Sequence, residues 1–510
     1  MSSEKYSAGA SALFLTGLGM LSQLLSFGYR VVLSRMVGAE AMGLYQLVMS
    51  AYSVLMSLSA VGLTACASNL SARYLALKNG RGMEQTRRMC LLLLGGAAAL
   101  LTVGVVGFYD PISVYLLGDA RTQMGLLLLL PCILLTGVEN IHKHIFYGAG
   151  VVRPPAFVEL AEQGIRAAAV LGLLVLFLPQ NAERTIGLIV TGMVICEIFS
   201  ACALATLYQK YFAGVREQGK GERRGALLSH IREIALPVGA TSLLGNLMGA
   251  ANATLIPRKL VEGGMTRSHA MEKLGVVCGM TLPMLSLPTV FLGALNLVMV
   301  PRLARSVALC QTKNLQRQIC RALTAASVLI LPAMAMMVVL GKDLAVMMFH
   351  RREAGECLFP LAISVVFSCY QGVFGGVLSG TNQQGKSAVI SLLCDVVQLI
   401  FVFTIPLPQV GIYGFVAGTL VSSVLGAVLC AKWAVQVSGV TVPVFECITA
   451  PALGAILMGT TGNLLFRYLK DNGCGVPLSG GMTLIYGVVL YIAALQAQGI
   501  SLREVFRLKS

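Results

Sequence analysis

The chain has 510 residues, of which 56% are hydrophobic and only 12% are charged, and its mean hydropathy is +0.79. These values exclude a soluble globular domain and are typical of a protein that crosses a membrane many times. The formal net charge is +16, but the basic residues stand in short connections between apolar segments. This is the positive-inside pattern of membrane proteins, and it argues against nucleic acid as a partner.

Apolar runs long enough to cross a bilayer predict an all-α polytopic membrane protein with about 14 transmembrane helices. The N-terminal segment has no convincing signal-peptide cleavage site, so we expect the first span to be retained. In chain order, the expected spans are 8–34, 42–66, 89–108, 123–145, 156–178, 186–209, 234–256, 274–300, 321–340, 358–379, 387–406, 411–432, 447–466 and 478–498.

The distribution of lysine and arginine predicts the orientation of the chain. With both termini in the cytoplasm, the cytoplasmic connections hold about twice as many lysines and arginines as the outer ones. The longest connection is strongly basic and belongs to the cytoplasmic side in this orientation. We therefore expect a multi-pass protein with cytoplasmic termini and a basic cytoplasmic linker at 211–233.

The first span carries an arginine, Arg30, inside an otherwise apolar helix. An arginine at the bilayer centre costs about 2.5–3.5 kcal/mol on insertion scales, so such a residue usually faces a protein interior or a water-filled cavity. Gln23, Ser26 and Arg30 belong to one polar stripe that covers about 80° of the helix surface. A guanidinium in a cavity suits phosphate or carboxylate recognition. The alternative is an arginine that extends to the membrane interface.

Two later spans also present polar faces that predict a solvated cavity. The fifth span carries Glu162 and Arg166 on one face, and the seventh carries Asn246 and Asn252 on one face. We interpret these four side chains as candidate substrate contacts. For Glu162 and Arg166, which are four residues apart, mutual neutralisation is an equal alternative.

Two intramembrane acids are candidates for coupling transport to an ion. Asp395 stands in the middle of the eleventh span without an adjacent base, and Glu197 stands in the middle of the sixth. A structural acid is the alternative for Glu197. The long eighth span contains Pro283 and Pro288, and we expect these prolines to set a bend or hinge.

An internal repeat predicts two similar halves. The segment from Tyr147 resembles the segment near Ser379, and in this comparison Arg166 corresponds to Gln398. Six spans separate the copies, and an even number preserves direction, so the halves should be parallel repeats. The predicted organisation is an N-terminal lobe, a linker, a C-terminal lobe and two trailing helices with a short tail, at 1–210, 211–233, 234–435 and 436–510.

Signals for an enzyme are absent from the sequence. It contains no nucleotide-binding P-loop, no zinc-ligand cluster and no nucleophile elbow, and its connections are short. We therefore expect a transporter that needs no cofactor and is coupled to Na⁺, H⁺ or the membrane potential. A non-transporting membrane scaffold is a third class, but scaffold helices should present apolar faces rather than these polar ones.

Two stretches of the chain resemble a known family. The first two spans, GYRVVLSRMVGAEAMGLYQLVMSAYSVLMSLSAVGL, and the eighth, with Pro283, Pro288 and Pro301, are similar to stage V sporulation protein B and related polysaccharide-biosynthesis membrane proteins. These belong to the multidrug/oligosaccharidyl-lipid/polysaccharide exporter superfamily, which includes the lipid II flippases and the multidrug and toxin extrusion antiporters. The order of 14 spans agrees with the family along the whole chain.

This resemblance implies a fold and a function. It implies two lobes in a V around a central cavity and alternating access that moves a polyprenyl-pyrophosphate-linked sugar to the outer leaflet. It also implies that Arg30 matches the first-helix cavity arginine of the lipid II flippases. Gln23 and Pro283 stand near positions where those flippases carry further arginines, so the full cationic cluster is not expected here.

The leading hypothesis is therefore a lipid-linked sugar flippase of a bacterial cytoplasmic membrane, in cell-wall, spore-cortex or polysaccharide synthesis. The expected partners are the lipid-linked glycan, membrane lipids and envelope-synthesis proteins, with no nucleic acid. The alternative is a cation-coupled multidrug antiporter. A cavity lined by cations favours the flippase, whereas one lined by acids favours the antiporter.

Overall fold

A computed structural model describes residues 8–178, 181–290, 311–381, 383–407 and 410–500, together with residues 299, 303, 306, 307 and 309. Side chains are described from Gly17 onward. The described residues form helices and turns and contain no strand, which confirms the expected all-α class. Contacts divide the chain into two compact units, of which one is Leu13–Gly275 and the other joins the described residues 8–12 to the part of the chain from Val276 onward.

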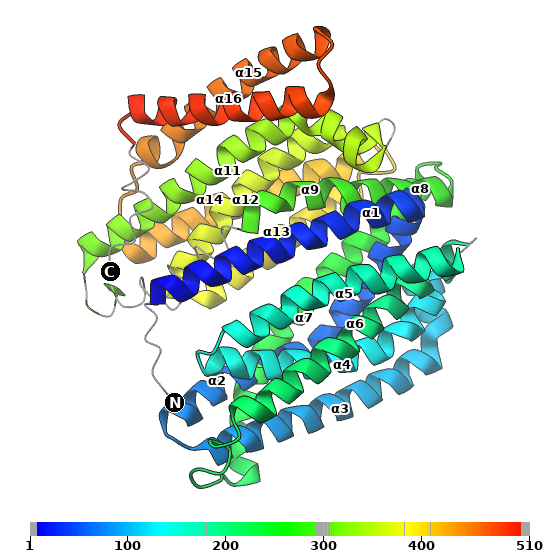
Figure 1. The fold of residues 1–510 in the computed structure, drawn as a ribbon, viewed down its shortest axis with the longest axis vertical. Helices are drawn as coiled ribbons and strands as arrows, with labels where there is room; N and C mark the ends of the chain where they lie inside the picture. Colours follow the sequence, from blue (N-terminus) through cyan, green and yellow to red (C-terminus); the bar gives the residue numbers. More distant parts are fainter. Residues whose placement is uncertain are drawn as a thin grey trace. The chain divides into compact units, whose positions relative to one another are not determined.

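The N-terminal unit is a bundle of long helices (Figure 1). Its elements in chain order are α1 (Ala8–Met56), η1 (Ser57–Val61), α2 (Gly62–Ala76), α3 (Gly80–Pro111), η2 (Ile112–Leu116), η3 (Ala120–Thr122), α4 (Gln123–Gly148), α5 (Arg153–Phe177), α6 (Ala182–Tyr211), α7 (Arg224–Glu262) and α8 (Arg267–Leu274).

The C-terminal unit is also helical, and α15 and α16 lie side by side in it (Figure 1). Its described elements are η4 (Gly275–Thr281), α9 (Leu282–Ser286), η5 (Leu287–Thr289), α11 (Thr312–Phe349), η6 (Arg352–Gly355), α12 (Leu358–Gly380), α13 (Gln384–Val402), α14 (Tyr413–Ser438), η7 (Phe445–Thr449), α15 (Ala450–Asp471) and α16 (Val476–Ala497).

Thirteen helical segments of the described residues are long and apolar enough to cross a membrane. The first, Gly17–Ala76, has 60 residues and would extend about 90 Å as a straight helix, three times the hydrocarbon thickness. It is interrupted at Gly38, whose φ of 78° and ψ of 173° are not helical. The break divides it into two membrane-length pieces, which match the predicted spans 8–34 and 42–66.

Gly38 can make this break because it has no side chain. Its positive φ lies in a region that residues with a β-carbon rarely adopt. The eighth predicted span, 274–300, is also irregular: π-helix η4 is followed by the short α9 and by 3₁₀-helix η5. Pro283 and Pro288 lie at the starts of α9 and η5, where the type of helix changes. Most of the span beyond residue 290 lies outside the described residues, as does Pro301.

The two units have the same pattern of neighbours around their repeated segments. In the N-terminal unit α4 and α5 both pack against α6, and in the C-terminal unit α12 and α13 both pack against α14. This is the arrangement expected from the repeat that pairs α5 with α13. Helix α7 packs against α2 and so lies in the N-terminal unit. The predicted lobe and linker boundaries at 210, 233 and 435 stay predictions.

Helices α1, α4, α5 and α6 share one apolar core. Leu33 and Tyr45 of α1, Cys132 of α4 and Val170 of α5 belong to it and are at least nine-tenths buried. Gly192 brings α6 close to α5, because a β-carbon there would lie 2.5 Å from Val170 Cγ2 and 2.8 Å from Val170 Cα. This close approach brings the polar faces of α5 and α6 together.

Candidate functional site

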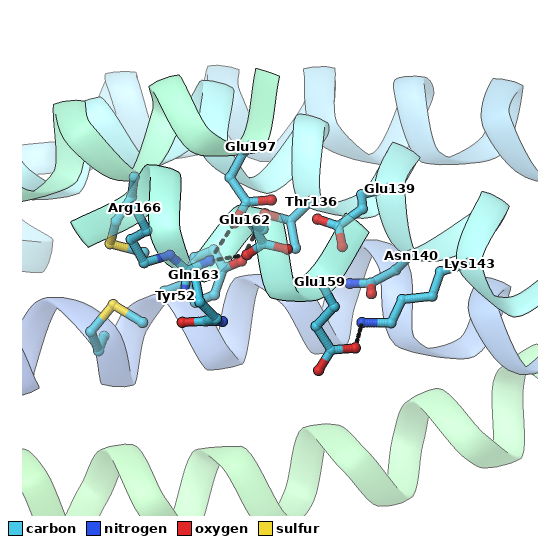
Figure 2. A pocket seen from close by; sticks show the side chains of 12 residues that line it. Tyr52, Thr136, Glu139, Asn140, Lys143, Glu159, Glu162, Gln163, Arg166 and Glu197 are labelled. Carbon is cyan, nitrogen blue, oxygen red and sulfur yellow. Dashed lines mark hydrogen bonds and ion pairs between the residues drawn. The ribbon is translucent and has the colours of Figure 1, made fainter. Parts of the chain in front are cut away.

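The N-terminal unit encloses a polar cavity of about 200 Å³ between helices α1, α4, α5 and α6. Figure 2 shows charged side chains of α4, α5 and α6 gathered around it, together with Tyr52 of α1. The cavity is lined by Met49, Tyr52, Thr136, Glu139, Asn140, Lys143, Glu159, Glu162, Gln163, Arg166, Met193 and Glu197.

Helical spacing explains why these residues share one space. Side chains at i, i+3, i+4 and i+7 stand on one face of a helix. On α4 the series runs from Thr136 to Lys143, and on α5 it runs from Glu159 to Arg166. Each helix therefore contributes one charged stripe, and packing against α6 places the two stripes around the same cavity.

Arg166 is the centre of the buried charge cluster. Its Nη2 donates to Oε1 of Glu162 and, at 3.1 Å, to Oε1 of Glu197, and its Nε donates to Sγ of Cys196 at 3.4 Å. The Arg166 side chain is 23% exposed, while that of Glu197 is 3% exposed. One guanidinium thus neutralises carboxylates from two helices.

Three polar bridges join α4, α5 and α6 in pairs. Lys143 of α4 pairs with Glu159 of α5 at 2.7 Å. Ser200 of α6 donates to Oε2 of Glu139 on α4 at 2.9 Å. The bridge from Arg166 on α5 to α6 completes the set. The site is therefore held together by three of the four helices that line it.

The cavity has more carboxylates than cations. Glu139, Glu162 and Glu197 are each at least 95% buried, and Glu159 adds a fourth carboxylate to the lining. The basic residues of the lining are Lys143 and Arg166. Buried charges without compensation are costly, so a site with excess carboxylate favours binding of a cation or a proton. Oε2 of Glu197 is buried and has no hydrogen-bond partner among the described residues.

A model of the family described as polysaccharide biosynthesis protein matches residues 8–271, and so covers every helix that lines the cavity. The chain belongs to the polysaccharide biosynthesis protein family. The predicted resemblance to stage V sporulation protein B and related polysaccharide-biosynthesis proteins is thereby confirmed, and the protein is a multi-pass bacterial membrane protein.

Individual relatives of this family member are distant in sequence but match most of the chain. It is 23% identical over 500 residues to Stage V sporulation protein B of Bacillus subtilis (strain 168), covering 94% of each chain. It is 21% identical over 441 residues to Lipid II flippase MurJ of the same organism, covering 77% of this chain and 76% of that one.

A solved structure shows the fold. An inward-facing multidrug resistance MATE family transporter of the MOP superfamily superposes with a TM-score of 0.67 at 13% identity. The match covers 84% of this family member and 99% of that chain.

In this family member, three of the predicted residues meet in one place. Glu162 and Arg166, expected as substrate contacts, and Glu197, expected as an ion site, form a single cluster. The alternative of mutual neutralisation thus describes the observed pairing of Glu162 with Arg166. Sequence reasoning missed Glu139 and Lys143, although their spacing of four residues inside the fourth span was a signal for them.

The predicted residues of the first helix do not line the cavity. Gln23 is exposed within the described residues, and Ser26 and Arg30 are partly exposed. Arg30 makes no hydrogen bond or ion pair with another residue of the described part of the chain. It nevertheless lies close enough to Tyr45 to interact electrostatically with the hydroxyl, as Arg166 also does.

The predicted residues of α7 lie apart from the cavity as well. Asn246 donates to Oγ of Ser57 at 2.5 Å, which ties α7 to η1. Asn252 is partly exposed, but its Oδ1 is buried and lacks a partner among the described residues. Asp395 belongs to α13 of the other unit and is partly exposed. The roles proposed for these residues stay predictions.

His142 of α4 is buried, although it stands near the end of the predicted span 123–145. It is 2% exposed, and its Nδ1 lies 2.8 Å from the carbonyl oxygen of Val138. The ring packs edge-on against Tyr208. Burial follows from the packing of α4 against α3 and α6, which the sequence pattern of α4 alone does not reveal.

An ionic network outside the spans holds the connection between α3 and α4. Asp119, which is 2% exposed, accepts from Nη2 of Arg121 at 2.8 Å and lies 3.5 Å from Nε of Arg267. Arg121 also pairs with Glu40 of α1 at 2.8 Å. Burial disfavours the ionised form of Asp119, but the hydrogen bonds and charge of Arg121 outweigh it, so its pKa lies below the ordinary value of 3.8.

Proposed function

We propose that this protein is a flippase that moves a polyprenyl-pyrophosphate-linked sugar across the cytoplasmic membrane by alternating access. The observation that carries the proposal is a charged cavity among membrane-length helices in a polysaccharide biosynthesis family member. Supporting it, one relative, matched over 77% of this chain, is the Lipid II flippase MurJ. The sugar part of such a substrate needs polar surroundings inside the membrane, and a helix bundle with polar faces supplies them.

Arg30 is our candidate for the pyrophosphate contact. Its guanidinium has no partner among the described residues, and a guanidinium binds phosphate oxygens in a bidentate manner. Gln23 and Ser26 share its helix face and would extend the polar contact. Asn246 and Asn252 remain candidate sugar contacts, whereas Glu162 and Arg166 are now engaged with each other. We assign that pair to the cluster rather than to direct substrate binding.

Substrate movement needs a source of energy, and the acids are candidates for ion coupling. Glu197 lies in a cluster with excess carboxylate, and Asp395 lies on α13. Coupling to Na⁺, H⁺ or the membrane potential would bias the inward and outward states. Pro283 and Pro288, where helix geometry changes, are the proposed hinge.

The proposed setting is the cytoplasmic membrane of a bacterium, with both termini in the cytoplasm and a role in cell-wall, spore-cortex or polysaccharide synthesis. Partners would be the lipid-linked glycan, surrounding lipids and envelope-synthesis proteins. The relative named Stage V sporulation protein B supports a place in envelope assembly during sporulation.

The second candidate function is a cation-coupled multidrug antiporter. It is favoured by the excess of carboxylates in the cavity and by the fold likeness to a MATE family transporter. Such an exporter would bind amphipathic cations near acids. The flippase is preferred because the family model is that of a polysaccharide biosynthesis protein and one relative is a lipid II flippase.

A flipping assay in liposomes tests the proposal. The purified full chain is reconstituted with a fluorescently labelled polyprenyl-pyrophosphate sugar, and movement is followed by a quencher that reaches one leaflet. We expect wild-type flipping, loss of it in Arg30→Ala, and partial retention in Arg30→Lys. Arg232→Ala, which removes an exposed arginine from α7, is the matched control. Efflux of an amphipathic cation without lipid flipping would instead establish the antiporter.

A further inference from the structure

Three buried side chains of α5 and α6 form a set that is able to ligate a metal ion. One carboxylate oxygen from Glu162, one from Glu197 and Sγ of Cys196 all lie within 4.8 Å of one another. At this separation the two carboxylates are able to ligate a hard cation such as Na⁺, whereas the thiol would be a ligand only for a softer ion such as Zn²⁺. The set is deeply buried, since all three residues are at least 95% buried.

A positive charge of the chain itself already occupies the middle of this set. Arg166 donates from Nη2 to Glu162 and to Glu197, and from Nε to Cys196. Each of the three candidate ligands is therefore a partner of one guanidinium. Arg166 comes from α5, one turn after Glu162, so its position follows from the i, i+4 spacing of the helix.

One acceptor of the set is left over. Oε2 of Glu197 is buried and without a hydrogen-bond partner in the described part of the chain, and the Glu197 side chain is 3% exposed. A flat guanidinium directs its hydrogens in fixed directions, so it satisfies the facing oxygens and leaves others without a donor. A spherical ion has no such restriction, and the unfilled oxygen marks the set as suited to one.

Electrostatics indicates what would happen without the arginine. Glu162 and Glu197 would then face each other and the neighbouring carboxyl group of Glu139 in a low-dielectric interior with no positive charge between them, which is strongly unfavourable. The two carboxylates would reduce this free-energy cost by taking up a proton or by binding a cation from solution. A cation tethered to the chain, such as the Arg166 guanidinium, makes this uptake unnecessary. Its effective concentration at the site does not depend on the ion content of the medium.

We propose that Arg166 is a built-in cation that takes the place of a free metal ion in the N-terminal unit. The native cluster of Glu162, Cys196 and Glu197 then binds no alkali cation, and removal of the guanidinium converts it into a cation site. On this proposal Glu197 remains a candidate for coupling to protons only, and any dependence of transport on Na⁺ would have to arise elsewhere in the chain, as at Asp395. This inference concerns binding alone, so it stands or falls separately from the proposed flippase activity.

Thermal unfolding of the detergent-purified full chain tests the proposal. NaCl is titrated against N-methyl-D-glucamine chloride at constant ionic strength, so that screening does not change. We expect no shift of the melting temperature for the wild type. Arg166→Ala and Arg166→Gln should melt lower than the wild type without Na⁺ and regain about 3 °C at saturating Na⁺. The double variant Arg166→Ala/Glu197→Gln should lose this response.

Two controls identify the tethered charge as the cause. Arg166→Lys keeps a cation on the same helix position and should remain insensitive to Na⁺. Arg232→Ala removes an exposed arginine outside the cluster and should behave like the wild type.

The proposal is overturned if neither Arg166→Ala nor Arg166→Gln responds to Na⁺. It is also overturned if the wild type is itself stabilised by Na⁺ and Glu197→Gln abolishes that effect. The Na⁺ response of the wild type and of Glu197→Gln tests the proposal even when the Arg166 variants do not yield folded protein.

Discussion

Arg166 on α5 donates to Glu197 on α6 across 3.1 Å, although the two residues are 31 positions apart in the chain. This pair joins the polar faces of two helices that otherwise pack through apolar side chains. Glu162 pairs with the same guanidinium, so the cluster is a network of charged groups. Such a network stabilises the fold more than one isolated ion pair does.

The first prediction concerns the stability contributed by this network. Arg166→Ala should lower the free energy of unfolding by about 3–5 kcal/mol, because it leaves two buried carboxylates without a counter-charge. Chemical denaturation followed by helix signal measures the change. Lys470→Ala is the comparison, since its pair with Asp343 is partly exposed and should contribute less than about 1 kcal/mol. Equal losses in the two variants would contradict the prediction.

A second prediction concerns the close contact between α5 and α6. Gly192→Val should destabilise the protein by about 1–3 kcal/mol, since even a β-carbon would collide with Val170. Gly172→Ala in α5 is the control, because a β-carbon there meets nothing within 4 Å. We expect that control to be neutral or slightly stabilising. A tolerated valine at position 192 would mean that α6 can move away from α5 at little cost.

The pair of Lys143 and Glu159 leads to a third prediction. Reversal of one charge, in Lys143→Glu or Glu159→Lys, should reduce both thermal stability and lipid flipping, because it adds a like charge beside the 2.7 Å contact. The double reversal Lys143→Glu/Glu159→Lys should recover a large part of both. A double-mutant cycle on melting temperature measures the coupling. Additive effects of the two single changes would show that the residues do not interact.

Acidic pH should weaken the connection held by Asp119. Its pKa is lower in the folded protein than the ordinary 3.8, so the folded state binds fewer protons there than the unfolded chain. The stabilisation is therefore complete above 3.8 and is lost as the pH falls through and below that value.

Asp119→Asn tests this pH dependence. We expect it to cost about 1–3 kcal/mol at neutral pH and to flatten the loss of stability on acidification. Unfolding measured as a function of pH in both proteins gives the comparison. Parallel curves for wild type and variant would exclude Asp119 as the titrating group.

Most of the helical architecture was predictable because hydropathy acts locally. A run of apolar residues long enough to span a bilayer satisfies its own backbone hydrogen bonds as a helix. Hence the predicted 358–379 corresponds to α12, and the predicted 123–145 corresponds to α4. The break at Gly38 also has a local cause, namely a backbone conformation that glycine allows.

The composition of the site was only partly predictable from the sequence. Periodicity placed Glu162 and Arg166 on one face of their helix, since they are one turn apart. It was not able to join them to Glu197, nor Glu139 to Ser200, because those contacts depend on which helix packs against which. The sequence by itself thus determined the spans and the polar face of each helix. The tertiary structure decided the partners, because charges on separate helices meet only where close packing, as at Gly192, brings the helices together.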